Sequence, residues 1–404
     1  MSVKQLCYIG FHVPEKQQLA KNLVQKFGFE LFAARVTASS KQLALRRGAA
    51  VFIVNERLKA AREVPPKFSS DPCKDQRFLY DVDLKHAVST ASNICFEMEN
   101  VPGVSQSLQE QGCQILIPPT NVADEGGCVT YAVVRSILGN ISHTLLDRSQ
   151  YCGLFLPGFL GVEGSSKDFR RDREVTHFDH ITYACTPGSS QAILDWYKKC
   201  FGFQRFFVHQ QDAAAEGYSI RGAGMGLRLT AMHCSGSGLT QLDHDCKLVL
   251  AESLPQQRKN QVDTFLEQHG GAGIQHVALY TSDIIRTAAA MAKSGASFVE
   301  PPITYYSDNN RAKEMQQVGQ DPQLLEHYGI LLDSEVAEES SSISPGVHGK
   351  QYLMQIFTKP LFAEDTFFLE LIERSGAIGF VNKPRNTIKC AFVSKPALEQ
   401  VWDK

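Results

Sequence analysis

The chain repeats itself, and this internal repetition restricts its fold more than any other feature of the sequence. Residues 6–32 and 178–207 share one plan: a strand-like run, a turn, an amphipathic helix, and Phe-Gly-Phe at the start of a second strand. Residues 92–120 and 274–304 share another: strand, helix, glycine, strand and a Pro-Pro stop. Two further strand-like runs follow each of these four segments. Repeats of this kind identify the structural unit from which a fold is built.

We interpret the chain as four βαβββ modules in two halves, an α+β fold of curved mixed sheets. The first half is predicted to span residues 1–150 and the second half residues 177–404. Between them, 151–176 carries glycines and a charged run, and we interpret it as a linker. The charged, proline-containing stretch 56–85 and the serine-rich stretch 335–350 are predicted to be loops.

Composition excludes several classes of protein. The 404 residues are 43% hydrophobic and 21% charged, which is typical of a soluble globular protein. The net charge of −2 offers no broad electrostatic surface for nucleic acid or anionic lipid. No apolar run reaches the roughly 18 residues of a transmembrane helix. The eleven scattered cysteines form no Cys-x-x-Cys pair, which argues for a reducing compartment and against a structural zinc cluster.

An asymmetry between the halves singles out three residues. The second half has His180, His276 and Glu370, three residue types that bind metals. At the aligned positions the first half has residues that do not form a metal-binding set. The first-half counterparts in this alignment are Cys7, Ile94 and Thr144. We therefore predict a metal site in the second half and a structural, metal-free first half.

Two imidazoles and one carboxylate are the facial triad of non-haem Fe(II) oxygenases. Three ligands on one face leave positions open for a bidentate substrate and dioxygen, whereas zinc in the same site would act only as a Lewis acid. A single histidine on an apolar strand is usually structural, but Glu370 interrupts an apolar run, where a carboxylate is unfavourable unless paired or metal-bound. His177 lies three residues before His180. We interpret it as structural, because residues three apart on a strand point to opposite faces.

Several stretches of the chain resemble the 4-hydroxyphenylpyruvate dioxygenase family, most closely its vertebrate dioxygenase-like branch: FDHITYAC, GGAGIQHVALYTSDII, QIFTKP and TFFLELIERSGAIGF. The resemblance covers most of the chain. It implies the vicinal oxygen chelate fold, which is built of paired βαβββ modules. It also implies that His180, His276 and Glu370 bind one Fe(II) per chain and that the substrate is a small 2-oxo acid used with dioxygen.

The same resemblance implies a set of substrate-binding residues. Glutamine amides would hold a ring hydroxyl or orient the keto acid, and phenylalanine rings would enclose the substrate ring. The residues are Gln261, Gln275, Gln355, Phe357 and Phe368. Structural alternatives stay open for two of them: Gln275 as polar filler beside a ligand, and Gln261 as an ordinary residue of a helix surface.

The chain departs from the homogentisate-forming members of this family at the substrate pocket. Ala184 and Ala251 stand where those enzymes have asparagine. The C-terminal lid is predicted to begin at Phe380, and Ile388 would take the place of the closing phenylalanine. Pro384 interrupts a continuous lid helix. These changes alter how the substrate is held and leave the metal ligands intact.

We therefore interpret the chain as an iron-dependent 2-oxo acid dioxygenase that converts 4-hydroxyphenylpyruvate to 4-hydroxymandelate, because a smaller lid residue lets the ring sit back and presents the benzylic carbon. The alternatives are a homogentisate-forming enzyme and a non-catalytic binding protein of the same fold. A zinc or nickel isomerase of the glyoxalase type would need ligands from both halves. Resemblance implies a mitochondrial role supplying a ubiquinone ring precursor, with the cytoplasm as the alternative location. The sequence allows a homodimer without determining the oligomeric state.

Overall fold

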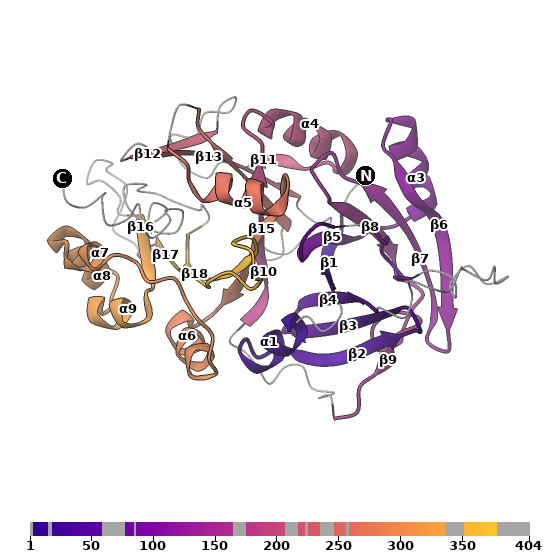
Figure 1. Ribbon diagram of the computed structural model, residues 1–404, viewed down its shortest axis with the longest axis horizontal. Coiled ribbons are helices and arrows are strands. Elements are labelled where there is room, and N and C mark those ends of the chain that lie inside the picture. Colours follow the sequence, from indigo (N-terminus) through magenta and orange to yellow (C-terminus); the bar gives the residue numbers. More distant parts are fainter. Residues whose placement is uncertain are drawn as a thin grey trace, which may run out of the picture.

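The computed structural model consists of two curved sheets with helices packed around them (Figure 1). The first half, indigo to purple in Figure 1, lies beside the second half, magenta to yellow. None of the described helices is long and apolar enough to cross a lipid bilayer. The structure describes residues 3–14, 18–58, 77–84, 86–164, 175–206, 217–222, 225–234, 246–255, 258–335 and 351–377.

The first half forms a nine-stranded sheet with the order β6-β7-β8-β5-β1-β4-β3-β2-β9. Strand β1 lies at its centre, parallel to β4 and antiparallel to β5. The elements are β1 (Gln5–Pro14), α1 (Leu19–Gln25), β2 (Glu30–Val36), β3 (Ser40–Arg47), β4 (Ala50–Arg57), β5 (Thr90–Glu97), α3 (Val101–Glu110), β6 (Ile115–Asp124), β7 (Gly127–Arg135), β8 (Ser142–Asp147) and β9 (Leu160–Gly161).

The second half repeats this arrangement in the order β11-β13-β14-β10-β15-β18-β17-β16, with β12 paired to β13. Strand β10 takes the central place of β1, parallel to β14 and antiparallel to β15, which confirms the predicted repeat. The elements are β10 (Val175–Cys185), α4 (Ser190–Phe201), β11 (Gln204–Phe206), β12 (Tyr218–Gly222), β13 (Met225–Cys234), β14 (Cys246–Ser253), α5 (Gln261–His269), β15 (Gly273–Thr281), α6 (Ile284–Lys293), α7 (Ile303–Ser307), α8 (Asn309–Gln317), α9 (Pro322–Tyr328), β16 (Leu331–Glu335), β17 (Gln351–Phe357) and β18 (Phe368–Ser375).

The boundaries between the halves differ from those read in the sequence. The predicted linker, 151–176, contains β9, which pairs with β2, and the first two residues of β10. The predicted loop 56–85 ends in a buried segment, because Phe78, Leu79 and Tyr80 are almost fully enclosed. The predicted loop 335–350 lies outside the described residues except for Glu335.

The two halves share one hydrophobic core, and a buried histidine sits where they meet. His143 of β8 is fully buried and stacks on Phe96 at 4.9 Å. Its Nε2 lies 2.8 Å from the hydroxyl of Tyr197 on α4 of the other half. Burial lowers the pKa of His143 to about 3. The imidazole is therefore neutral in the folded protein at physiological pH.

This histidine predicts a loss of stability in acid. Its folded pKa of about 3 lies below the usual 6.5, so the unfolded chain binds the extra proton between these values. The free energy of unfolding should therefore fall as the pH drops through this window, by up to about 1.4 kcal/mol per pH unit from this residue. Urea unfolding between pH 4 and pH 7 should show a shallower pH slope in His143→Phe, by roughly that amount. An unchanged slope would show that His143 is protonated without unfolding.

Candidate metal centre

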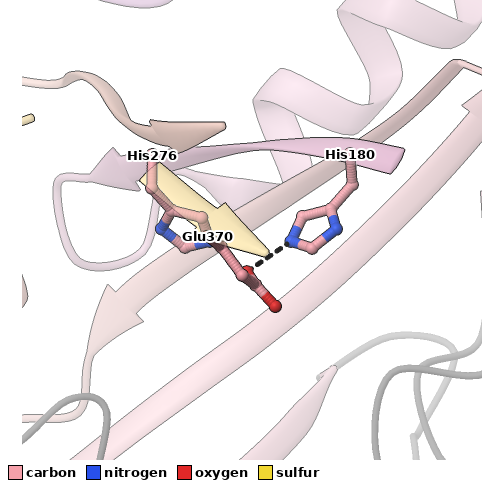
Figure 2. Close-up of side chains that lie close together, drawn as sticks. All are labelled: His180, His276 and Glu370. Atoms are coloured by element: carbon pink, nitrogen blue, oxygen red, sulfur yellow. Dashed lines mark ion pairs between the residues drawn. The ribbon is translucent and has the colours of Figure 1, made fainter. Parts of the chain in front are cut away.

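Three neighbouring strands at the centre of the second sheet bring the predicted ligands together (Figure 2). On β15, Ala278 pairs with His180 of β10 on one side and with Glu370 of β18 on the other. Directly paired residues share a face of the sheet, and His276 lies two residues before Ala278 on that same face. The alanine between the two larger side chains has only a methyl group, which leaves room for them to converge.

The ligand atoms of the three side chains face a common point. Nε2 of His180 lies 3.3 Å and Nε2 of His276 lies 3.4 Å from Oε2 of Glu370. All three ligand atoms lie within 4.8 Å of one another, and among the described residues this is the one such group of His, Cys, Asp or Glu. The side chains are only 4%, 3% and 2% exposed in the order His180, His276 and Glu370. Figure 2 shows both imidazole rings directed at the carboxylate.

The electrostatics of the cluster suit a bound cation. Burial alone would raise the pKa of Glu370, but the charge of His180 and hydrogen bonds with both histidines outweigh it and lower the pKa below its usual value. The carboxylates of Glu370 and Asp179 in turn outweigh burial and raise the pKa of His180. Burial lowers the pKa of His276, so its ring is neutral and can donate a lone pair. Oε1 of Glu370 is buried and has no hydrogen-bond partner in the described structure. An ionised, partly unsatisfied buried carboxylate is unfavourable unless a cation neutralises it, so the residues fit a metal.

Each ligand histidine follows an extra residue in its strand. The pairing of β10 with β15 skips Asp179 just before His180, and it skips Gln275 just before His276. Such β-bulges bend the strand and re-aim side chains. As a result the Nδ1 atom of His276 lies 3.3 Å from Oε1 of Gln275, while Nε2 faces Glu370.

The same bulges correct two counterparts predicted for the first half. Cys7 is itself the extra residue of β1, so its neighbour Tyr8 corresponds to the first ligand histidine. Asn93, rather than Ile94, corresponds to the second histidine. Thr144 corresponds to the glutamate, as the sequence alignment predicts. The counterparts predicted from the sequence are one residue out on β1 and β5. The strand pairing fixes the register, because each half carries its bulges at equivalent positions.

A backbone carbonyl fills this counterpart position in the first half. The hydroxyls of Tyr8 and Thr144 donate hydrogen bonds to the carbonyl oxygen of Tyr80, over 3.1 and 2.6 Å. The amide of Asn93 donates to the Thr144 hydroxyl over 3.0 Å. Tyr80 is fully buried with φ of 63°, a left-handed conformation that non-glycine residues seldom adopt. Polar groups of the chain itself therefore occupy the place that the ligands surround in the second half.

Three of the predicted substrate residues, Phe357, Phe368 and Gln275, lie next to His276. Phe368 stacks on the His276 ring at 4.7 Å, and Phe357 meets that ring edge-on at 6.3 Å. Nε2 of Gln275 is buried and unpartnered within the described structure, so this amide has a free donor beside the second histidine.

The remaining predicted residues are placed less directly. Gln355 lies two residues before Phe357 on β17, hence on the same face, and its buried Nε2 also has no partner in the described ranges. Gln261 begins α5, where Asn260 and Asp263 form a capping box, and its buried Oε1 has no hydrogen-bond partner among the described residues. Phe380 and Ile388 of the predicted lid lie outside the described residues.

The two alanines that the resemblance sets in place of asparagines lie side by side. Ala184 of β10 pairs directly with Ala251 of β14, and both are fully buried. Ala184 lies four residues after His180, on the face of the sheet that carries the ligands. This part of the face therefore presents methyl groups instead of amides.

Comparison with known proteins shows which sequences this chain resembles. The profile of the Glyoxalase/Bleomycin resistance protein/Dioxygenase superfamily matches residues 177–323. The "4-hydroxyphenylpyruvate dioxygenase-like protein" of Mus musculus is 42% identical over 93% of each chain. The "4-hydroxyphenylpyruvate dioxygenase" of Pyricularia oryzae is 29% identical over 73% of this chain and 66% of that protein.

A solved structure agrees with the fold. A mutant of 4-hydroxymandelate synthase from Streptomyces coelicolor superposes with a TM-score of 0.71, at 21% identity, over 94% of this chain and 95% of that one. The predicted vicinal oxygen chelate fold is thereby confirmed. The identity and coverage of the mouse protein settle the family: the chain belongs to the 4-hydroxyphenylpyruvate dioxygenase-like family.

Proposed function

We propose that this protein is an Fe(II)-dependent dioxygenase that decarboxylates 4-hydroxyphenylpyruvate and hydroxylates its benzylic carbon to give 4-hydroxymandelate. The observation that carries the proposal is the buried group of His180, His276 and Glu370, whose ligand atoms lie within 4.8 Å of one another. Two imidazoles and one carboxylate on one face are the ligand set of non-haem Fe(II) oxygenases. Iron bound there would supply the redox chemistry with dioxygen.

The surroundings of the cluster support an aromatic 2-oxo acid as substrate. Phe368 and Phe357 meet edge-on at 6.1 Å and give the site two aromatic walls. The buried amides of Gln275 and Gln355 have unpartnered Nε2 donors within the described structure, and such donors would hold carboxylate, keto or phenol oxygens. Apolar walls with a few aimed polar groups are typical of small-molecule sites.

The choice of product depends on where the pocket holds the ring, because both products require the same metal and the same substrate. The paired alanines 184 and 251 offer no amide to fix the substrate for attack on the ring. Ile388 is predicted to stand in the lid. The two alanines and this smaller lid residue together favour a substrate pose that presents the benzylic carbon. Homogentisate is the competing product, because the sequence also resembles homogentisate-forming enzymes. The Pyricularia oryzae relative bears the name 4-hydroxyphenylpyruvate dioxygenase.

Product analysis tests this proposal. The protein loaded anaerobically with Fe(II) and then given 4-hydroxyphenylpyruvate and air should form 4-hydroxymandelate. The two products have the same mass, so chromatography against authentic standards must separate them. Predominant homogentisate would show that the paired alanines do not control the outcome. Absence of any turnover by an iron-loaded protein would favour a non-catalytic binding role.

We also propose that the protein works in mitochondria, where its product would serve as a ubiquinone ring precursor; the support for this is the family resemblance stated from the sequence. Fractionation of cells that express the full-length tagged protein tests the location. Recovery with mitochondrial matrix markers is expected, and recovery only with cytoplasmic markers would contradict it.

A further inference from the structure

A buried ion pair lies directly behind the first ligand histidine. Oδ1 of Asp179 lies 2.8 Å from Nδ1 of His180. The guanidinium of Arg374 donates to both oxygens of this carboxylate, from Nε over 2.7 Å and from Nη2 over 2.8 Å. The side chains of Asp179 and Arg374 are 2% and 10% exposed. We propose that Asp179, held by Arg374, is a positioning residue that fixes the His180 ring with Nε2 facing the metal; this proposal rests on the proposed metal site.

The local backbone explains how neighbouring residues on one strand come to touch. In a regular strand Asp179 and His180 would point to opposite faces. Asp179 is the extra residue of the β10 bulge, which re-aims the side chain so that its carboxylate reaches the imidazole beside it. Arg374 lies four residues after Glu370 on β18, and therefore on the same face as that ligand. The clamp thus ties the two outer ligand strands together across β15.

The chemistry of the contact determines which imidazole nitrogen is free. A carboxylate only accepts hydrogen bonds, so it selects the ring form that carries its proton on Nδ1. The Nε2 lone pair then points toward Glu370, whose Oε2 lies 3.3 Å away. The planar guanidinium holds the carboxylate by two parallel bonds and so fixes its orientation as well as its charge. His276 has a weaker counterpart, since the neutral amide of Gln275 approaches its Nδ1 only to 3.3 Å.

Metal titration of the purified full-length protein tests the inference without depending on turnover. Co(II) serves as the probe, because its absorption reports the ligand set. Asp179→Asn keeps the shape but weakens the clamp, and the dissociation constant for Co(II) should rise about 10- to 100-fold. Arg374→Met should act in the same direction, and Arg374→Lys should restore part of the affinity.

The first half supplies a matched control. Asp81 lies 2.8 Å from Nε2 of His12, and these side chains are 4% and 6% exposed, so this buried pair resembles the proposed clamp. Asp81→Asn should lower stability and leave the affinity for Co(II) unchanged. Equal losses of affinity in Asp81→Asn and Asp179→Asn would reduce the clamp to a general structural role and overturn the proposal.

The ring form of His180 provides a second readout. With Zn(II) as a diamagnetic probe and ¹⁵N-labelled histidine, NMR of the unmodified protein should show His180 protonated on Nδ1 and metal-bound through Nε2. In Asp179→Asn this pattern should weaken. An unchanged pattern with unchanged Co(II) affinity would refute the inference. A protein that binds Co(II) as described but does not turn over 4-hydroxyphenylpyruvate would contradict the proposed function and leave this inference standing.

Discussion

Replacement of Glu370 by glutamine should abolish metal binding and dioxygenase activity while the chain stays folded. The carboxylate is the one anionic member of the cluster, and both histidines direct Nε2 at its Oε2. With a neutral amide of the same shape, the site keeps two neutral imidazole ligands but loses the negative charge that would balance a divalent cation. Metal content should fall from one ion per chain to near zero, and turnover should fall below detection.

Thermal unfolding gives this prediction a second measurement. Metal at 100 times its dissociation constant should stabilise the unmodified protein by about 2.7 kcal/mol and Glu370→Gln by nothing measurable. Glu252→Gln is a matched control, because Glu252 is a buried carboxylate of β14 that accepts a hydrogen bond from the Ser190 backbone. It should bind metal normally. Full metal content in Glu370→Gln would contradict the account, and so would two metal ions per unmodified chain.

Replacement of Ala278 by leucine should block the metal site by filling it. Ala278 pairs with His180 on one side and Glu370 on the other, and it is fully buried. Three added carbons on this face would enter the space where the ligand atoms converge. Overpacking of this kind typically costs about 1–3 kcal/mol of stability. The affinity for metal should fall far more than a loss of stability of this size can explain.

The repeat provides the control for this second prediction. Cys95 occupies the position of Ala278 in the first half, pairing with Tyr8 and Thr144, and it is also fully buried. Cys95→Leu should cost comparable stability and leave metal content unchanged. Isothermal titration with Co(II) on both variants decides the matter. Normal affinity in Ala278→Leu would mean that the three side chains do not converge above this alanine.

Much of the fold follows from the sequence because the repeats carry strong local signals. The strand that ends in Pro14 and the strand that ends at Cys185 are both apolar runs followed by an amphipathic helix, and both form the centre of a sheet. The ligand residues also stand out in the sequence, since a carboxylate at position 370 interrupts a buried strand.

Other features depend on contacts that linear order does not show. The first-half counterparts of the ligand histidines depend on the register in which two strands pair, and that register gives Tyr8 and Asn93 instead of Cys7 and Ile94. The pair of Asp179 and Arg374 joins residues 195 positions apart. The sequence predicts a loop for the segment whose Tyr80 carbonyl takes the counterpart position in the first half. The apolar triplet Phe78-Leu79-Tyr80 is the one signal that indicates its burial.

The cluster of His180, His276 and Glu370 should bind iron, and a 2-oxo acid should then chelate that iron; one anaerobic titration tests both most directly. The protein is loaded with Fe(II), 4-hydroxyphenylpyruvate is added without oxygen, and the visible spectrum is recorded. A weak metal-to-ligand charge-transfer band should grow to saturation at one substrate per iron, and it should be absent in Glu370→Gln. Stoichiometric iron binding with no such band would contradict the account.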